Sequence, residues 1–249
     1  AIGTPVFVTN KVAEGLTNWG THSIDGSRFV LVEPQPRWVM GAVERRTDRF
    51  ERDTAIEDAC LGLVHFEGDI QLFIQSDLMR KGATAGAFQI KGTEGMIEVS
   101  ESQVRVMNAT SNGWLDIDIG AGEGDRAIGG NTNAAQAREL VQWLEGDVEE
   151  HRGSGRQARV TVEIMMGLYE SARRKQIVSF PLQEKGYPLE LMIAEGGLPV
   201  EIEGRYDIRG FLSWEGVDPK RYKQLADEGK GHHQIMRLIH TEMEEAARS

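Results

Sequence analysis

The sequence predicts an α+β fold: one large, mainly antiparallel sheet with helices packed on one face, in a single domain. Two observations predict it. Between residues 37 and 119 the chain carries a run of about seven short strand-like segments, and the connections between them are too short for parallel crossovers. Helical patterns stand before this run and after it. The run therefore supplies the sheet, and the flanking segments supply the helices.

The first half of the chain opens with strand-like residues 5–8 and a helical pattern around residues 18–32, and Pro34 and Pro36 then mark a loop. Residues 67–69, Glu-Gly-Asp, predict a tight hairpin turn between two apolar runs. The strand-like segments, which are short and divided by Gly, Asn or polar residues, are 37–45, 59–66, 70–75, 87–90, 96–99, 104–107 and 114–119.

The second half carries two helical patterns, at residues 133–145 and 157–174. Gly146 is placed to end the first helix, and Ser154 is placed to cap the second. A returning strand at 177–180 ends at Pro181, and a charged helical tail begins at Pro219. The first helix has the apolar stripe Ala137, Leu140, Val141 and Leu144, and the second has Val162, Met165, Met166, Tyr169 and Ala172.

Composition excludes several classes of function. The 249 residues hold 28 Lys and Arg against 39 Asp and Glu, a formal net charge of −11, which argues against a nucleic-acid groove. One cysteine, Cys60, excludes an internal disulfide framework. No apolar run approaches the roughly 20 residues of a membrane span. We therefore expect a cytoplasmic protein without a nucleic-acid or membrane partner.

Two local motifs suggest cofactor sites. The strand-like residues 115–119 run into a glycine-rich turn at 120–124, as in a methyltransferase or dinucleotide loop. Antiparallel-looking strands precede this turn, and Asp125 stands where the third glycine of the dinucleotide fingerprint would fall, so we interpret it as an exposed loop. His232-His233 and His240 suggest a metal site. Adjacent helical residues point about 100° apart and no ligand set is complete, so we predict no metal. Ser23 and Ser27 lack the glycines of a nucleophile elbow and Cys60 lacks a helix N-terminus to activate it, so we predict no covalent nucleophile.

The strongest site candidate is the segment at residues 18–25, where Asn18, His22 and Asp25 have the spacing i, i+4 and i+7. This spacing places an amide, an imidazole and a carboxylate on one face of a helix. On spacing alone, a solvated helix face is the better interpretation, because most such polar faces are simply hydrated.

Four segments, in their order and spacing, resemble the C-terminal domain of the Gfo/Idh/MocA oxidoreductase family. Residues 2–8 resemble its first strand and residues 18–25 its active-site helix. Residues 92–99 resemble its hairpin, and residues 163–172 with 178–182 resemble its late helix and following strand. The resemblance covers residues 1–203, and residues 204–249 are then a partly helical C-terminal extension.

The resemblance implies roles for four residues. In the family, an Asp, three residues and a His occur on this helix, and the His exchanges a proton with a substrate hydroxyl. That His aligns with His22, whereas Asn18 stands where the family often has Asp. An amide can bind a sugar hydroxyl but cannot raise the basicity of the imidazole with a charge. Asp25 could orient His22 or bind a hydroxyl, and Arg28 could bind the carboxylate of a sugar acid or form a structural pair.

The family also implies an N-terminal Rossmann domain that binds NAD or NADP, so we expect no cofactor-binding residues here and no redox activity from this chain alone. Our leading hypothesis is the substrate-binding domain of an NAD(P)-dependent sugar or polyol dehydrogenase, a homo-oligomer through its sheet. Its substrate would be a small sugar, polyol or sugar acid. The alternative is a non-catalytic carbohydrate-binding or scaffold protein without the Rossmann domain. A methyltransferase built on residues 120–124 is a third, weaker hypothesis.

Overall fold

The computed structural model describes residues 1–12, 15–51, 54–77, 88–100, 103–118, 130–207, 214–230 and 232–248. The first half forms β1 (Pro5–Val12), α1 (Trp19–Val30), β2 (Pro36–Glu44), β3 (Thr47–Glu51), β4 (Thr54–Ala55), β5 (Ala59–Phe66), β6 (Gln71–Asp77), β7 (Phe88–Gly92), β8 (Gly95–Val99), β9 (Val104–Asn108) and β10 (Leu115–Ile117). The second half forms α2 (Gly130–Glu145), α3 (Gly155–Arg174), β11 (Val178–Ser179), α4 (Pro188–Ala194), β12 (Ile202–Asp207), α5 (Pro219–Asp227) and α6 (His232–Arg248).

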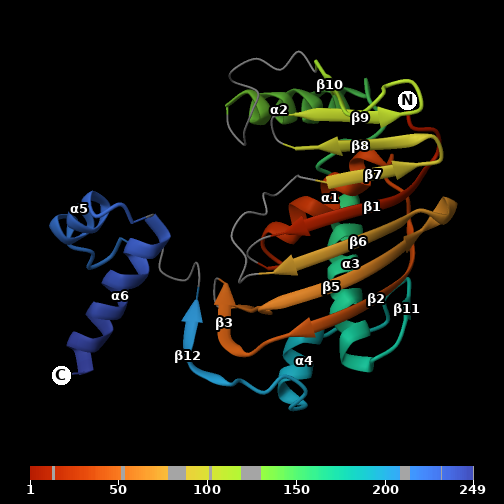
Figure 1. Ribbon diagram of the computed structural model, residues 1–249. Coiled ribbons are helices and arrows are strands. Elements are labelled where there is room, and N and C mark those ends of the chain that lie inside the picture. The colour runs from red at the N-terminus through yellow and green to blue at the C-terminus, as the bar shows by residue number, and fades with distance from the viewer. Residues whose placement is uncertain are drawn as a thin grey trace.

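Nine strands form the large sheet, in the order β10-β9-β8-β7-β1-β6-β5-β2-β11 (Figure 1). Every neighbouring pair is antiparallel except β1 and β6, so the predicted mainly antiparallel sheet is confirmed. The sequence did not predict the parallel pair. Short connections constrain consecutive strands only, whereas α1, β2 and β5 all lie between β1 and β6 along the chain.

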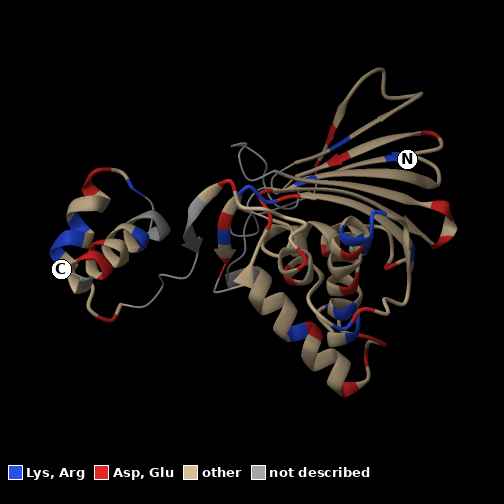
Figure 2. Ribbon diagram, turned by 90° about the horizontal axis from the view of Figure 1, so that it is seen from below, with Lys and Arg blue, Asp and Glu red and all other residues tan. Residues whose placement is uncertain are grey.

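Helices α1 and α3 pack on one face of this sheet, as predicted, with α4 against α3, and Figure 2 shows no described helix on the other face. α3 approaches closely because Gly41 of β2 and Gly62 of β5, partners in the ladder, leave room for Leu168. A Cβ on Gly41 would lie 2.3 Å from the Leu168 carbonyl oxygen. The glycine pair therefore determines where α3 crosses the sheet, and Leu168, Ile164 and Tyr169 are fully buried there.

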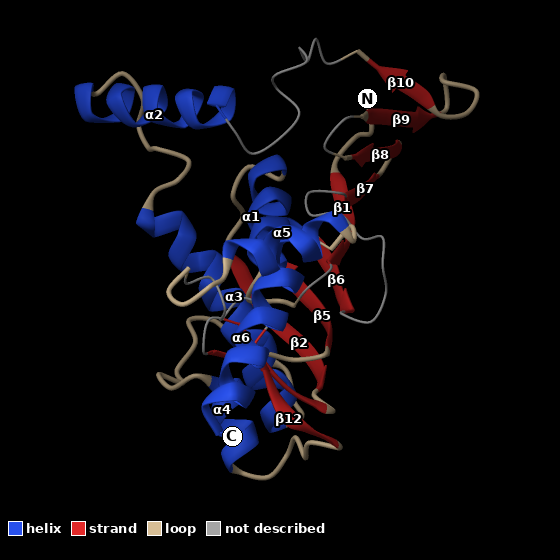
Figure 3. Cartoon of the chain, turned by 90° about the vertical axis from the view of Figure 1, so that its left-hand side faces the viewer, coloured by secondary structure: helices blue, strands red, loops and turns tan. Residues whose placement is uncertain are grey.

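Helix α2 differs from its prediction in its packing. The helix forms where its pattern indicates and ends at Gly146, which has a positive φ of 84°. Its apolar stripe does not enter the core, however, because α2 packs closely against no other helix or strand that the structure describes. In Figure 3, α2 stands apart from the sheet. Leu140, Val141 and Leu144 are consequently exposed, by 41%, 50% and 74%.

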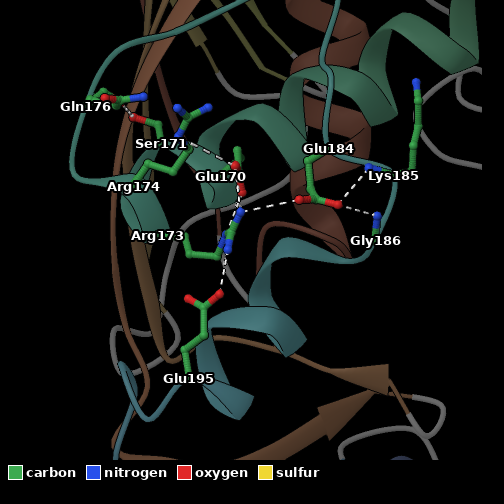
Figure 4. A network of polar contacts seen from close by, with 9 residues as sticks. All are labelled: Glu170, Ser171, Arg173, Arg174, Gln176, Glu184, Lys185, Gly186 and Glu195. Carbon is green, nitrogen blue, oxygen red and sulfur yellow. Dashed lines mark hydrogen bonds and ion pairs between the residues drawn. The ribbon is translucent and has the colours of Figure 1, made fainter.

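The C-terminal end of α3 is held by an arginine. The Arg173 guanidinium donates to Glu170 one turn earlier, at 2.7 Å, to Glu195 beyond α4, at 2.6 Å, and to Glu184, at 3.3 Å (Figure 4). Glu184 in turn accepts from the backbone N–H groups of Lys185 and Gly186. These contacts fasten the segment after β11 and the end of α4 to α3.

A second, three-stranded sheet in the order β12-β3-β4 and the helix α4 were not predicted. β12 spans residues 202–207, so the domain boundary expected at residue 203 falls inside a strand that pairs with β3. The charged tail is helical, as α5 and α6, and has its own small apolar cluster around Leu225 and Met236. The glycine-rich turn at 120–124 lies outside the described residues.

Candidate functional site

Helix α1 presents one face to the sheet and the other to a groove. Its buried face includes Gly20, Ser23, Ile24 and Ser27. Asn10, buried on β1, reaches this face and donates from Nδ2 to the Ser23 carbonyl at 3.0 Å and to Ser27 Oγ at 3.1 Å. These two bonds fix the rotation of α1 about its axis, so the residues at 22, 25 and 29 face away from the sheet.

The segment before α1 is fixed by a buried carboxylate that the sequence did not single out. Glu57 is fully buried and accepts hydrogen bonds from the Leu16 N–H and from the Tyr169 hydroxyl on α3. Burial, together with the neighbouring Glu57 charge, raises the pKa of Tyr169 well above its usual value. The hydroxyl thus stays protonated as a donor, and the start of α1 is tied to α3.

The groove lies between α1, the inner face of α2 and the segment 151–153, and its volume is about 550 Å³. His22 and Asp25 lie on the α1 wall, and Gln136 and Glu139 lie on the α2 wall. The described residues that line it are His22, Asp25, Gly26, Phe29, Glu33, Thr132, Asn133, Ala135, Gln136, Glu139, His151, Arg152 and Gly153.

Two of the four predicted site residues meet in this groove. His22 is exposed, and its ring lies 5.5 Å from that of Trp19, centroid to centroid. Asp25 accepts a 2.9 Å hydrogen bond at Oδ1 from Thr161 on α3. Asn18 does not line the groove and is the N-cap residue of α1, with its backbone carbonyl accepting from Thr21. The structure therefore does not bring Asn18 into the groove with His22 and Asp25.

Arg28 is fully buried and does not line the groove. It donates from Nη1 to the Gln157 carbonyl at 3.0 Å and to Thr161 Oγ1 at 3.1 Å, and its Nη2 lies 2.8 Å from a Glu33 carboxylate oxygen. Burial lowers the pKa of Arg28 and raises that of Glu33. This geometry favours the structural pair over a contact with a substrate carboxylate.

Three groove residues were missed at the level of sequence. Glu139 of α2 accepts from the backbone and guanidinium of Arg152, and these hydrogen bonds lower the pKa of Glu139. His151 is buried, stacks on Trp143, and has Nε2 3.3 Å from the Gln136 carbonyl oxygen. A His-Arg pair in the link between two predicted helices was the available signal, but nothing local connects it to His22.

The groove carries an excess of carboxylates. Asp25, Glu33 and Glu139 line it, and Arg152, the one arginine among its described lining residues, is already paired with Glu139. A dinucleotide pyrophosphate needs free cations or a cluster of backbone N–H groups, so the described lining does not fit one. Across the described residues, no group of His, Cys, Asp and Glu side chains is placed to hold a metal ion. None of the described helices combines the length and apolarity needed to cross a bilayer.

Comparisons with known proteins find likeness at the level of structure. No family model matches the sequence, and no curated protein matches it either. An oxidoreductase from Agrobacterium radiobacter, in complex with NAD+, L-tartaric acid and magnesium, superposes with a TM-score of 0.55 at 19% identity, covering 72% of this chain. A levoglucosan dehydrogenase in complex with NADH and levoglucosan gives 0.57 at 17%, and an NAD-binding oxidoreductase from Klebsiella pneumoniae gives 0.57 at 16%, each covering 73%.

The chain spans 58% to 60% of the length of these three structures. Identities of 16% to 19% demonstrate a shared fold rather than a shared activity. Residues 1–203, on which the sequence resemblance rested, include the whole nine-stranded sheet and helices α1 to α4. The chain therefore has the fold of NAD-binding oxidoreductases of the Gfo/Idh/MocA type, over somewhat less than two thirds of their length.

Proposed function

We propose that this chain is the substrate-binding part of an NAD(P)-dependent oxidoreductase that acts on the secondary hydroxyl of a sugar or polyol. One observation carries the proposal: His22 and Asp25 stand side by side on the free face of α1, in a groove, on a fold shared with proteins solved with NAD+ or NADH. An imidazole is the side chain best suited to take a hydroxyl proton near neutral pH.

In this proposal His22 is the general base for the substrate hydroxyl. Asp25 is one turn further along α1 and is itself held by Thr161, so its second oxygen is available to a neighbouring hydroxyl. His151 and Gln136, on the opposite side of the groove, add polar groups for further hydroxyls. Phe29 and Gly26 supply the apolar surface that the C–H face of a sugar ring requires.

The charges of the groove favour a neutral substrate over a sugar acid. A carboxylate substrate would enter beside Asp25, Glu33 and Glu139, and both nearby arginines are already paired, Arg28 with Glu33 and Arg152 with Glu139. The neighbouring structures hold ligands of both classes, since levoglucosan is a neutral sugar anhydride and tartaric acid is a diacid. The described lining supports the neutral class.

The nicotinamide cofactor would bind to a separate nucleotide-binding domain, because the described residues of the groove do not fit a pyrophosphate. NAD or NADP would there accept the hydride. The described residues do not distinguish the two nucleotides. Nothing in the role of His22 depends on that choice, since the imidazole handles only the hydroxyl proton.

We also propose that the open face of the sheet mediates self-association. Met40 of β2, Leu63 of β5 and Phe73 of β6 are direct neighbours across the ladder, so they share the face that none of the described helices covers. Met40 and Phe73 are exposed by 50% and 37%, and Leu61, two residues from Leu63, by 47%. A contiguous apolar row of this kind on a sheet is typical of a protein interface.

The deciding experiment measures turnover in the natural full-length polypeptide with NAD and NADP against a panel of neutral polyols and sugar acids. His22→Ala should lower kcat by about 10² to 10⁴, the usual contribution of a general base. His240→Ala, on α6, is the matched control and should retain wild-type kcat. Unchanged turnover in the His22 variant would refute the assignment.

Binding and catalysis are separated by a second measurement on the same proteins. Titration calorimetry of the polyol panel should show binding by wild type, and binding within a few fold of it by His22→Ala. Sugar binding without turnover on either nucleotide would replace the dehydrogenase proposal with the carbohydrate-binding or scaffold hypothesis.

A further inference from the structure

We infer that α2 is a self-association helix: two copies of this chain pair through antiparallel α2 helices. The inference is independent of the proposed function. It begins from the exposed stripe of α2, in which Ala137, Leu140, Val141 and Leu144 lie within one side of the helix. Exposing three large aliphatic side chains on one helix face is costly in water, at roughly 1 to 2 kcal/mol per side chain.

The opposite side of α2 is already used. Gln136, Glu139 and Trp143 face the segment 151–153, through the Glu139–Arg152 pair and the stacking of Trp143 on His151. α2 is therefore held in position by its polar side, while its apolar side is presented outward. Folding back onto the described core would break these contacts, so the apolar side is available to a partner.

Three residues of the stripe, Ala137, Val141 and Leu144, have the spacing of two helices that pair side by side, and we call this row the seam. Ala137, Val141 and Leu144 are separated by four and three residues, the alternation of the core positions of a coiled coil. In an antiparallel pair, the small Ala137 of one copy lies opposite the large Leu144 of the other, and the two Val141 side chains meet near the two-fold axis. A small side chain thus lies opposite a large one at both ends of the seam, and the two helices can interdigitate.

Charge complementarity selects a second copy and the antiparallel direction. Arg138 and Glu145 flank the seam on the same side, seven residues apart, and neither makes an ion pair within the described residues. When two α2 helices run antiparallel about a two-fold axis near Val141, Arg138 of each copy faces Glu145 of the other. A parallel pair would instead bring like residues to the same height. The surface is thus self-complementary, as an isologous interface must be.

The proposed contact also bears on the groove. Gln136 and Glu139 line the groove from the side of α2 that faces away from the seam. Pairing through the seam would thus fix one wall of the groove in each copy without closing it. A helix pair of this length buries a small interface, so we expect a dimer that dissociates at micromolar concentrations rather than an obligate one.

The test is cysteine cross-linking in the full chain. The native thiol does not interfere, because Cys60 is buried and burial raises its pKa well above the usual value. Val141→Cys places a thiol at the two-fold axis, within reach of its symmetry mate, and should form a disulfide-linked dimer under mild oxidation. Gln142→Cys, the adjacent residue on the far side of the helix, is the matched control and should cross-link at least about ten-fold less.

Charge reversal identifies the register in the same Val141→Cys background. Arg138→Glu alone and Glu145→Arg alone each place two like-charged pairs across the seam, and each should reduce cross-linking about ten-fold. The double variant Arg138→Glu/Glu145→Arg restores both pairs in reversed polarity and should restore cross-linking. Since both residues are exposed and form no ion pair with another described residue, circular dichroism should show unchanged folding.

Two results would overturn the inference. One is cross-linking of Val141→Cys no greater than that of Gln142→Cys, which would leave the stripe to another segment of a longer polypeptide or to a different protein. The other is failure of the double charge reversal to recover what either single reversal loses, which would exclude the antiparallel register.

Discussion

Helices α2 and α3 are both amphipathic, but the apolar side of α3 is buried and that of α2 is exposed. Both carry an apolar stripe at helical spacing, and both form where that spacing predicts. α3 buries Ile164, Leu168 and Tyr169 completely, whereas Leu144 on α2 is 74% exposed. The difference lies in the receiving surface, because the glycine pair of β2 and β5 accepts α3 and no described element accepts α2. An amphipathic pattern thus predicts a helix and its apolar side, but not what covers that side.

The largest effect should come from filling the space that admits α3. Gly41→Ala would place a Cβ 2.3 Å from the Leu168 carbonyl oxygen, a backbone atom that cannot rotate away. We expect a loss of about 3 kcal/mol or more in the free energy of unfolding, measured by urea denaturation. Gly155→Ala, at the first turn of α3 where a Cβ meets nothing within 4 Å, is the control. Equal stability of the two variants would contradict the account of α3 docking.

Truncating one leucine on each helix tests the comparison directly. Leu168→Ala on α3 should cost about 2 to 5 kcal/mol, because it opens a cavity between helix and sheet. Leu144→Ala on α2 removes a side chain that is mostly in water and should change the free energy of unfolding of the monomer by under about 0.5 kcal/mol. Denaturation of both variants at a concentration low enough to exclude dimers provides the measurement. Similar losses would mean that α2 is packed more tightly than its exposure indicates.

The polar anchor between α1 and α3 should matter less than the apolar packing. Arg28→Met keeps most of the side chain's volume but removes the donors to Gln157 and Thr161 and the partner of Glu33. Because Glu33 retains 26% exposure, we expect a loss of about 2 kcal/mol rather than the full cost of a buried unpaired charge. Arg174→Met, at the exposed C-terminal end of α3, should be close to neutral. A substrate-binding role for Arg28 would instead appear as weakened sugar-acid binding with stability unchanged.

The smallest effect that we expect is a loss of stability at low pH that is confined to α2. Hydrogen bonds from Arg152 lower the pKa of Glu139, so their contribution to stability is complete above the ordinary glutamate pKa of about 4.3. It is lost as the pH falls through the lowered pKa of the folded protein. Hydrogen exchange followed across this range should show α2 amides losing protection before those of α3. In Arg152→Gln the pKa of Glu139 should return toward its ordinary value, and identical profiles for wild type and variant would refute the anchor.

The site shows how much a local pattern can reveal. The i, i+4, i+7 spacing located the free face of α1, and His22 and Asp25 do line one groove. Asn18 has the same spacing but is the N-cap residue, with non-helical φ and ψ, and it does not line the groove. Arg28, three residues after Asp25, lies on the buried face because Asn10 fixes the rotation of α1. Spacing gives the relative angle of side chains on a helix, and a contact from a distant strand decides which angle faces the groove.

The sequence by itself determined the α+β class, most of the strands of the sheet, the position of α3 with its Ser154 cap, and the segment that carries His22. These follow from period, turn residues and caps, which act over a few neighbouring residues. Only the tertiary structure decided the parallel β1–β6 pair, the second wall of the groove, the burial of Arg28 and the exposure of the α2 stripe. Each of these depends on segments more than sixty residues apart in the sequence that come together, or on a contact that is not made. Such long-range contacts are determined by packing of the whole chain rather than by any local pattern.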